Sequence, residues 1–401
     1  MATYTVVFLS LLALIPLAAS QCSVEKAKPG LRRAIYDFAT ELTTRVAIDS
    51  ENHFVMSPLS LWTLLAAVSE GADSETLVQL KRALRLHPRK CFNSKYYEIL
   101  RGVVESQGET ILERGGAVVI DEGFSVKKAF KSRIDAAGVC KVLTTQFAAA
   151  EDAASAINSY VSHATHGAVE EITSPEDLDG KSLLLLDTIY FKGKWTVPFS
   201  TADTEVSTFY DEFGGAAGDV NLMFITGEFN VAQIDKIQAK VLELPYAGGK
   251  YSMLVFLPYT DVPLVQVIEA LNLINLQSIF HLYEKKPART VMVQLPRFKI
   301  ESNLDFLVEL LQDMGLTQMF DEQASFPLIS DQALYVSTLL QKANIEVTEE
   351  GTVASAVSET GFSSRLMPEQ FVAQKPFLYM IVDKVNEVVL FTGAYSKPSV
   401  Y

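Results

Sequence analysis

The chain has 401 residues, enough for one large domain or for two or three smaller ones. Hydrophobic residues make up 49% of it and charged residues 20%, which excludes a disordered protein and supplies a large core. The formal net charge of −14 makes the surface acidic, so we expect neither nucleic acid nor an anionic membrane as a partner.

Residues 1–20 have the pattern of a secretory signal peptide. An apolar run from Val6 to Ala19 is followed by Ser20, although positive charge is missing before the run. The alternative is a membrane anchor, but this run is shorter than the roughly 20 residues that span a bilayer. We therefore predict a secreted, extracellular protein whose mature chain is residues 21–401.

Three cysteines would remain in the mature chain: Cys22, Cys91 and Cys140. In an oxidising compartment this odd count allows at most one internal disulfide and leaves one thiol. The sequence does not choose the pairing. Cys22 lies close to the mature N-terminus, where an unpaired or an intermolecular thiol is also possible.

Helix patterns come first along the chain. Residues 31–49 and 58–86 carry apolar side chains three and four positions apart, which is typical of helices. Within the second range, Asp73-Ser74-Glu75 can begin a new helix that runs from Thr76 to Leu86. Residues 157–172 are a further helix candidate with a stop near Gly167.

Strand patterns dominate later. Residues 182–191 form a continuous apolar run that suits a strand covered on both faces. Residues 239–258 contain two strand patterns around Ala247-Gly248-Gly249, which indicates a hairpin. Residues 287–302 and 371–395 predict two further pairs of strands. Early helices and late strands with some interleaving favour one mixed α+β domain.

Motifs of enzymes are missing from the sequence. It contains no Gly-x-Ser-x-Gly, no His-Glu-x-x-His and no Cys-x-x-Cys. The glycines of residues 212–219 lack the Lys-Ser/Thr of a phosphate-binding loop and indicate a surface turn. We expect a protein that is not an enzyme.

Metal and cofactor sites are not indicated either. His163 and His166 share a helix face and could hold a metal, but no cysteine or carboxylate joins them at ligand spacing. The acidic pairs Glu151-Asp152 and Glu170-Glu171 look like solvated surface. We therefore predict no metal and no cofactor.

A basic cluster stands out against the acidic background. It could bind a sulfated polysaccharide or an acidic partner, or its cations could simply complement the dipole at a helix C-terminus. Its members are Lys81, Arg82, Arg85, Arg89 and Lys90, with His87 among them.

The segment IEVTEEGTVASAV at residues 345–357 closely resembles the hinge of the serpin family, which reads Glu-Val-x-Glu-Glu-Gly-Thr followed by small residues. Other family motifs occur in order along nearly the whole mature chain. They lie at residues 54–72, 157–172, 189–195, 242–246, 254–258, 295–302 and 310–320.

The resemblance implies a single monomeric serpin domain with three β-sheets, about nine helices and an exposed reactive loop at about residues 349–370. It implies a suicide-substrate inhibitor: a serine protease cleaves the loop, and the loop inserts into the main sheet before the acyl-enzyme is hydrolysed. The implied hinge residues are Glu349, Glu350, Gly351, Thr352, Val353, Ala354, Ser355 and Ala356.

Insertion as a strand requires that alternate loop residues face the core. One alternate set is small and uncharged: Thr352, Ala354, Ala356 and Ser358. The other set carries the charge of Glu359 and also Val353 and Val357, where the family usually has glutamate and alanine. We therefore expect insertion to be slowed but not blocked.

The family spacing places the cleaved bond at Arg365–Leu366. An arginine there suits the carboxylate at the bottom of a trypsin-like pocket, so we predict a trypsin-like serine protease as the covalent partner. The alternative is a non-inhibitory serpin that acts as a carrier, storage or binding protein.

The resemblance also assigns six residues to the region where the main sheet opens: Ser57, Ser60, Asp187, Trp195, Arg297 and Gln341. Asp187 and Gln341 stand where the family usually has asparagine and histidine. A Gln341 amide can donate to the Asp187 carboxylate, which would rebuild the network. We further expect Glu349 to pair with Arg297 and to restrain the hinge.

Overall fold

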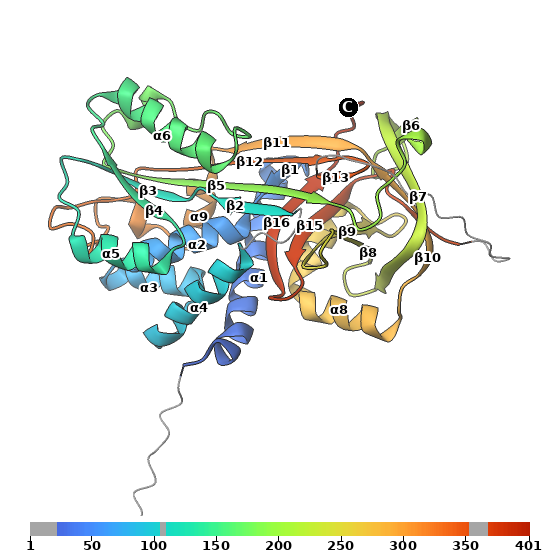
Figure 1. The fold of residues 1–401 in the computed structure, drawn as a ribbon, viewed down its shortest axis with the longest axis horizontal. Helices are drawn as coiled ribbons and strands as arrows, with labels where there is room; N and C mark the ends of the chain where they lie inside the picture. The colour runs from blue at the N-terminus through green and yellow to red at the C-terminus, as the bar shows by residue number, and fades with distance from the viewer. Residues whose placement is uncertain (1–21, 105–109, 353–367) are drawn as a thin grey trace, which may run out of the picture.

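The predicted change from helices to strands along the chain is present in the computed structural model, which describes residues 22–104, 110–352 and 368–401 (Figure 1). The predicted signal peptide and the Arg365–Leu366 bond lie outside these ranges. The described ranges contain nine α-helices: α1 (Val24–Asp49), α2 (Pro58–Ser69), α3 (Ser74–Ala83), α4 (Lys90–Val103), α5 (Lys128–Ala137), α6 (Ala150–Ala164), α7 (Leu264–Glu269), α8 (Leu276–Lys285) and α9 (Leu307–Asp313).

A seven-stranded sheet, called the central sheet below, has the order β11-β12-β5-β3-β4, with β2 and β13 also paired to β5. Helix α6 covers one face of it, and α2 and α9 lie against the other face (Figure 1). Its strands are β2 (Ile111–Arg114), β3 (Ala117–Asp121), β4 (Lys141–Thr145), β5 (Leu183–Lys194), β11 (Phe298–Leu304), β12 (Thr338–Val347) and β13 (Gly351–Thr352).

The remaining strands form a nine-stranded sheet in which the long strand β7 belongs to two parts. The first part of β7 pairs with β6 and β10, and its last residues, Asn230–Ile234, pair with β8. This shared strand joins two of the three implied sheets into one network. The strands are β1 (Phe54–Met56), β6 (Glu205–Tyr210), β7 (Ala216–Ile234), β8 (Ala239–Pro245), β9 (Tyr251–Pro258), β10 (Arg289–Pro296), β14 (Glu369–Val372), β15 (Phe377–Asp383) and β16 (Val388–Tyr395).

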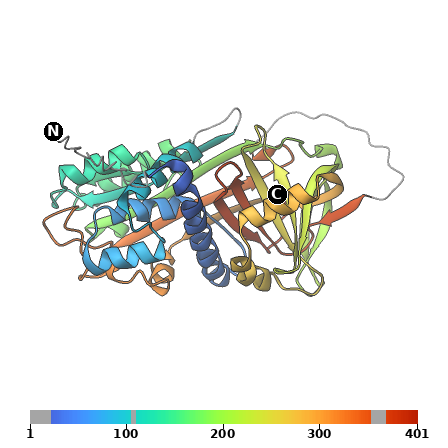
Figure 2. The same cartoon turned by 90° about the horizontal axis from the view of Figure 1, so that it is seen from below.

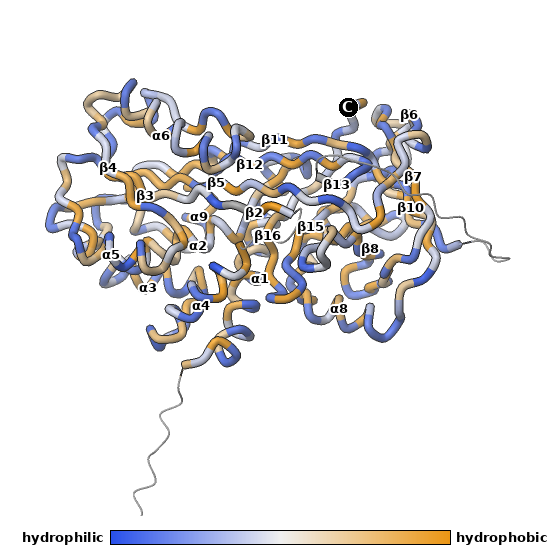
Figure 3. The backbone as a smooth tube through the Cα atoms, in the orientation of Figure 1, coloured by the Kyte–Doolittle hydropathy of each residue, from blue (hydrophilic) through white to orange (hydrophobic). Residues whose placement is uncertain are grey.

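The two sheets give the molecule two dissimilar ends. Figure 2 shows most helices gathered at one end and the nine-stranded sheet at the other, with the long N-terminal helix α1 between them. Hydrophobic segments run through the strands, and hydrophilic residues collect at the outer turns (Figure 3).

Strand β5 is buried on both faces, as its apolar run predicted. Leu183 and Leu185 belong to the main core, whereas Leu184 and Leu186 lie in a smaller cluster beneath α6. All four side chains are fully buried. The face that carries Leu184 and Leu186 is therefore a second small core and not a solvated surface.

Some element predictions need correction. Helix α6 begins at Ala150, before the predicted start, and ends at Ala164, because His166 and Gly167 adopt positive φ values of 51° and 79°. Strands β10 and β11 do not pair with each other. Only Arg297 separates them, which is too short for a hairpin, so the chain passes from one sheet to the other.

The disulfide that the sequence left open joins Cys22 to Cys91, and Cys140 is a free, buried thiol. The bridge connects Cys22, two residues before α1, with the first turn of α4, and these two helices are also in contact. Burial raises the pKa of Cys140 to about 12, so its reactive thiolate form is scarce at neutral pH.

This pairing predicts the outcome of a thiol titration. We expect no fast reaction with Ellman's reagent in the native protein and one reactive thiol per chain in urea, because the bridged cysteines do not react. A Cys140→Ala variant is the control and should give no thiol in either condition. Three reactive thiols in urea without reductant would contradict the Cys22–Cys91 bridge.

Candidate functional site: the opening of the central sheet

The centre of the central sheet is a parallel pair of strands that is joined at one end only. The register between β12 and β5 covers Thr338–Lys342 on β12 and Leu184–Thr188 on β5. At the far end of β5, Gly351 and Thr352 of β13 pair antiparallel with Lys194 and Gly193. Strand β13 therefore begins a new strand at the end where β5 and β12 separate.

A tight turn from Thr348 to Gly351 carries the chain from β12 into β13. The Thr348 N–H donates to the Gly351 carbonyl at 2.9 Å, and the Gly351 N–H donates to the Thr348 carbonyl at 3.2 Å. Gly351 has φ +126°, and a Cβ atom there would lie 2.4 Å from the Gly193 carbonyl oxygen. Only glycine fits this position, both for its backbone angle and for its closeness to β5.

The backbone of this turn is bound to the residues that follow β5. The Trp195 N–H donates to the Glu350 carbonyl at 2.9 Å, and the Phe199 N–H donates to the Glu349 carbonyl at 2.7 Å. The Trp195 indole N–H donates to the Thr348 carbonyl at 3.0 Å, while its ring stacks on Tyr246 with 4.5 Å between centroids.

The Glu349 side chain also binds the turn to neighbouring residues. It lies 3.6 Å from the Arg297 guanidinium, which is the pairing expected from the sequence. It also accepts the Thr204 hydroxyl at 2.8 Å, a partner that sequence reasoning missed because Thr204 belongs to no recognised motif. Glu349 is buried, so the loss of either partner would leave a charge poorly compensated.

A buried polar network joins β5 and β12 within the part where the two strands pair. Asp187 and Gln341 are direct register partners, and the Gln341 amide donates to Asp187 Oδ2. The same carboxylate oxygen accepts the Ser60 hydroxyl at 2.6 Å. Asp187 and Gln341 therefore connect the two strands through their side chains.

Serine residues at the start of α2 complete this network. The Gln341 amide N–H donates to the Ser57 carbonyl at 3.0 Å, and the Ser57 N–H donates to Gln341 Oε1 at 3.2 Å. The Ser57 hydroxyl caps α2 by accepting the Ser60 N–H and donates to the Leu390 carbonyl at 2.7 Å. The network thus also connects the central sheet to β16.

Asp187 is the residue of the network whose hydrogen bonding is incomplete. It is fully buried, and its Oδ1 has no hydrogen-bond partner among the described residues. Burial raises the pKa of Asp187 to about 6, although the donors Ser60 and Gln341 oppose the shift. The carboxyl group is therefore charged at neutral pH in a place that favours its neutral form.

The basic cluster extends from the last turn of α3 to the first residue of α4, with Arg85 and Arg89 in the segment between the two helices. Lys81 and Arg82 lie in the last turn of α3, as the helix-dipole alternative requires, but Lys90 begins α4. Arg85 forms an ion pair with Asp37 at 2.6 Å, and Arg89 lies over the Phe92 ring. Four of the five cationic residues are exposed, and Lys81 is half-buried.

Other sequence alternatives find no support in the described part of the chain. No group of three or more metal-ligating side chains occurs there. His163 and His166 are not on one helix face, because α6 ends between them, and His166 contacts the Tyr190 ring instead. None of the described helices is long and apolar enough to cross a membrane.

The raised pKa of Asp187 predicts a pH-dependent effect of Asp187→Asn on stability. The pKa of Asp187 is about 6 in the folded protein and near 3.8 in the unfolded chain. Below pH 3.8 the carboxyl group is neutral in both states, so its ionisation does not lower the free energy of unfolding. Its destabilising effect grows as the pH rises and levels off above the folded pKa at about 3 kcal/mol. Urea unfolding should therefore show a gain from Asp187→Asn that is larger at pH 7.5 than at pH 5, by about 1 kcal/mol. A gain that is equal at both pH values would refute a raised pKa.

The ion pair at Glu349 predicts that Arg297→Gln loosens the turn. The Trp195 and Phe199 amides donate to this turn, so their hydrogen exchange should become several-fold faster when Glu349 loses its cation. Lys299→Gln, an exposed change two residues along, is the control and should leave both rates unaltered. Equal exchange in all three proteins would show that Thr204 alone holds Glu349.

Comparisons with known proteins agree with this arrangement. The family model described as serpin (serine protease inhibitor) matches residues 33–398. Plasminogen activator inhibitor 1 of Neovison vison is 29% identical over 371 residues, which are 90% of this chain and 92% of the relative.

Two solved structures extend the similarity to three dimensions. Native protease nexin-1, solved with heparin, superposes with a TM-score of 0.81 at 27% identity and covers 92% of this chain and 100% of its own. Human thyroxine-binding globulin shares the fold with a TM-score of 0.83 at 21% identity, over 93% of this chain and 100% of its own. The chain is a member of the serpin family.

Proposed function

We propose that this protein is a secreted suicide-substrate inhibitor of trypsin-like serine proteases and not an enzyme. The observation that carries the proposal is the turn at Thr348–Gly351, which starts a strand antiparallel to β5 where β5 and β12 separate. A cleaved loop that follows Thr352 would have a started strand to extend. The protease-inhibitor relatives support the same conclusion.

The register of β13 determines where each loop residue would go. Continued one residue at a time from Thr352 opposite Gly193, it brings Ala354 opposite Phe191 and Ala356 opposite Ile189. Phe191 and Ile189 face the main core, so the small set of loop residues would enter the core without a steric clash.

The same register would bring Ser358 beside Asp187. Side chains directly opposite each other share one face of a sheet, so the Ser358 hydroxyl could donate to the unpartnered Asp187 Oδ1. Separation of β12 would break the Gln341–Asp187 bond, and Ser358 would replace it. Insertion would then give the buried Asp187 Oδ1 the hydrogen-bond donor that it lacks in the described part of the uncleaved protein.

The chemical step uses the protease's serine. Its hydroxyl oxygen attacks the Arg365 carbonyl, the Arg365–Leu366 bond breaks, the Leu366 amine leaves with the proton, and an ester joins Arg365 to the enzyme. Insertion would then carry the bound protease away before water cleaves the ester. About a dozen new strand hydrogen bonds would contribute on the order of 10 kcal/mol.

Secretion and polyanion binding are parts of this proposal. The Cys22–Cys91 disulfide supports export, because such bridges persist in oxidising compartments. The exposed cations at the end of α3 and the start of α4 support a sulfated polysaccharide as a second partner, and the nexin-1 structure was solved with heparin. Arg85 would have to leave Asp37 to take part.

One observation favours the alternative of a non-inhibitory binding protein. The register would bring Glu359 opposite Leu186, which is fully buried beneath α6. A carboxylate there would be costly unless α6 moves away, so insertion could stop before it. The loop would then be an ordinary protease substrate.

The first test mixes the mature protein with trypsin and analyses the products on denaturing gels. We expect a covalent band of protein plus trypsin that is lost in Arg365→Ala, because the bond to the enzyme forms at that carbonyl. Complete cleavage at Arg365 with trypsin still active and no such band would favour the non-inhibitory alternative.

The second test compares matched charges on the two faces of the loop. Ala354→Asp would place a carboxylate in the main core and should convert the inhibitor into a substrate. Ser355→Asp would lie on the face of Tyr190, which is half-buried, and should keep most of the covalent complex. Loss of the complex in both variants would refute the register continued from β13.

A further inference from the structure

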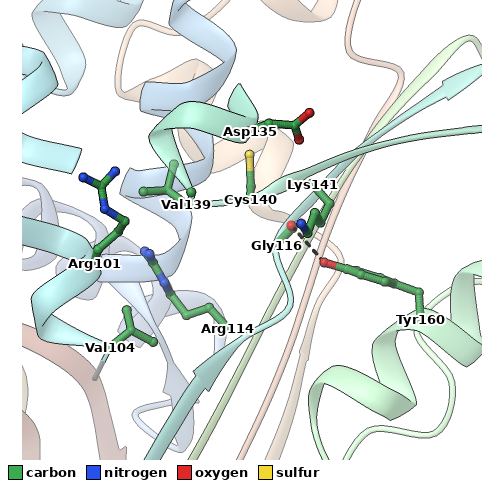
Figure 4. A pocket seen from close by; sticks show the side chains of 10 residues that line it. Arg101, Val104, Arg114, Gly116, Asp135, Val139, Cys140, Lys141 and Tyr160 are labelled. Atoms are coloured by element: carbon green, nitrogen blue, oxygen red, sulfur yellow. Dashed lines mark hydrogen bonds between the residues drawn. The ribbon is translucent and has the colours of Figure 1, made fainter. Parts of the chain in front are cut away.

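A cavity of about 270 Å³ lies outside the opening of the central sheet, among α4, α5, α6, the strands β2 and β4, and Gly116 just before β3. Figure 4 shows the side chains of Arg101 and Arg114 on one side and that of Tyr160, from α6, on the other. Nothing in the proposed inhibition uses this cavity.

The cavity is positively charged in an acidic protein. Arg101, Arg114 and Lys141 line it, against the single carboxylate of Asp135. Asp135 forms no ion pair with Arg114 in the described structure, and its side chain points away from both arginines (Figure 4). A negative group inside the cavity would therefore meet excess positive charge.

Arg114 carries the argument. Its Nε and Nη1 atoms are buried and have no hydrogen-bond partner among the described residues. By contrast, Arg101 Nη1 donates to the carbonyls of Ala136 and Ala137, at 3.2 and 2.7 Å, at the end of α5. A buried guanidinium N–H group without an acceptor is costly, so a ligand oxygen that accepts it would gain a favourable hydrogen bond.

The charge of Arg114 is retained despite this burial. Burial lowers the pKa of Arg114 to about 10, and Asp187 on the neighbouring strand opposes the decrease. Asp187 acts from behind the cavity wall: a Cβ atom on Gly116 would lie 4.0 Å from Asp187 Oδ1 and 3.6 Å from Cys140 Cβ. Arg114 is thus cationic at neutral pH, and its Nε and Nη1 groups still lack an acceptor among the described residues.

The shape and the remaining walls define the ligand class. Val104 and Val139, which lie beside the arginines, and the Tyr160 ring across the cavity supply its apolar surface (Figure 4). A cavity of about 150 Å³ holds one benzene ring, so this one accommodates one or two rings with a charged group. We propose that the cavity binds a small organic carboxylate, whose oxygens accept the free N–H groups of Arg114 while its apolar part contacts Val104, Val139 and Tyr160.

The test is calorimetric titration of the mature protein with 2-naphthoate, which has two rings and one carboxylate. We expect saturable binding at one site, and binding weaker by at least about tenfold in Arg114→Gln, which removes a charge-assisted interaction. Arg33→Gln, the same change on the exposed face of α1, should bind as the unaltered protein does. The neutral isostere 2-naphthamide should bind at least about tenfold more weakly to the unaltered protein.

Arg114→Lys provides a second variant if Arg114→Gln does not fold. It retains the charge but loses the planar guanidinium, so its affinity for 2-naphthoate should fall between those of the unaltered protein and Arg114→Gln. The absence of saturable binding by the unaltered protein, or equal affinities in the Arg114 and Arg33 variants, would overturn the proposal. Trypsin inhibition does not enter this readout, so the two proposals can fail separately.

Discussion

Two parallel strands that share hydrogen bonds over only part of their length are the constraint on which this molecule depends. β12 and β5 are joined from Thr338 to Lys342, and beyond that the turn at Thr348–Gly351 starts another strand. The order of the central sheet thus leaves a place for one more strand between two existing ones. A continuous β5–β12 pairing would have removed that place.

Side-chain hydrogen bonds determine the stability of the part where β12 and β5 pair. Asp187 and Gln341 are partners both in the register and in a side-chain hydrogen bond, so the strands cannot part without breaking that bond. Ser57, which caps α2, accepts a hydrogen bond from Gln341, and Ser60, in the first turn of α2, donates one to Asp187. The unpartnered oxygen of Asp187 offsets part of this stabilisation, which makes the joined half of the strand pair weaker than its number of contacts suggests.

Much of this arrangement could be predicted from the sequence, because it depends on local patterns and on a family resemblance. Local sequence signals predicted the buried strand β5 and the hairpin of β8 and β9. The pairing of Glu349 with Arg297 was expected from the family resemblance. The disulfide, the partner Thr204 and the cavity at Arg114 do not, because they join residues far apart in the sequence. The apolar run of residues 182–191 predicted that both faces of β5 are covered, but it could not show which side chains form the smaller core beneath α6.

The turn at Gly351 has a consequence for the order of events. Adding a strand to a sheet normally begins with a costly nucleus, in which the chain loses freedom before it gains hydrogen bonds. Here the first two pairs, at Gly351 and Thr352, already exist. An inserting loop would therefore only have to add further hydrogen-bonded pairs to those at Gly351 and Thr352. The rate of insertion would then be set by the separation of β5 from β12 and not by the formation of the first pairs.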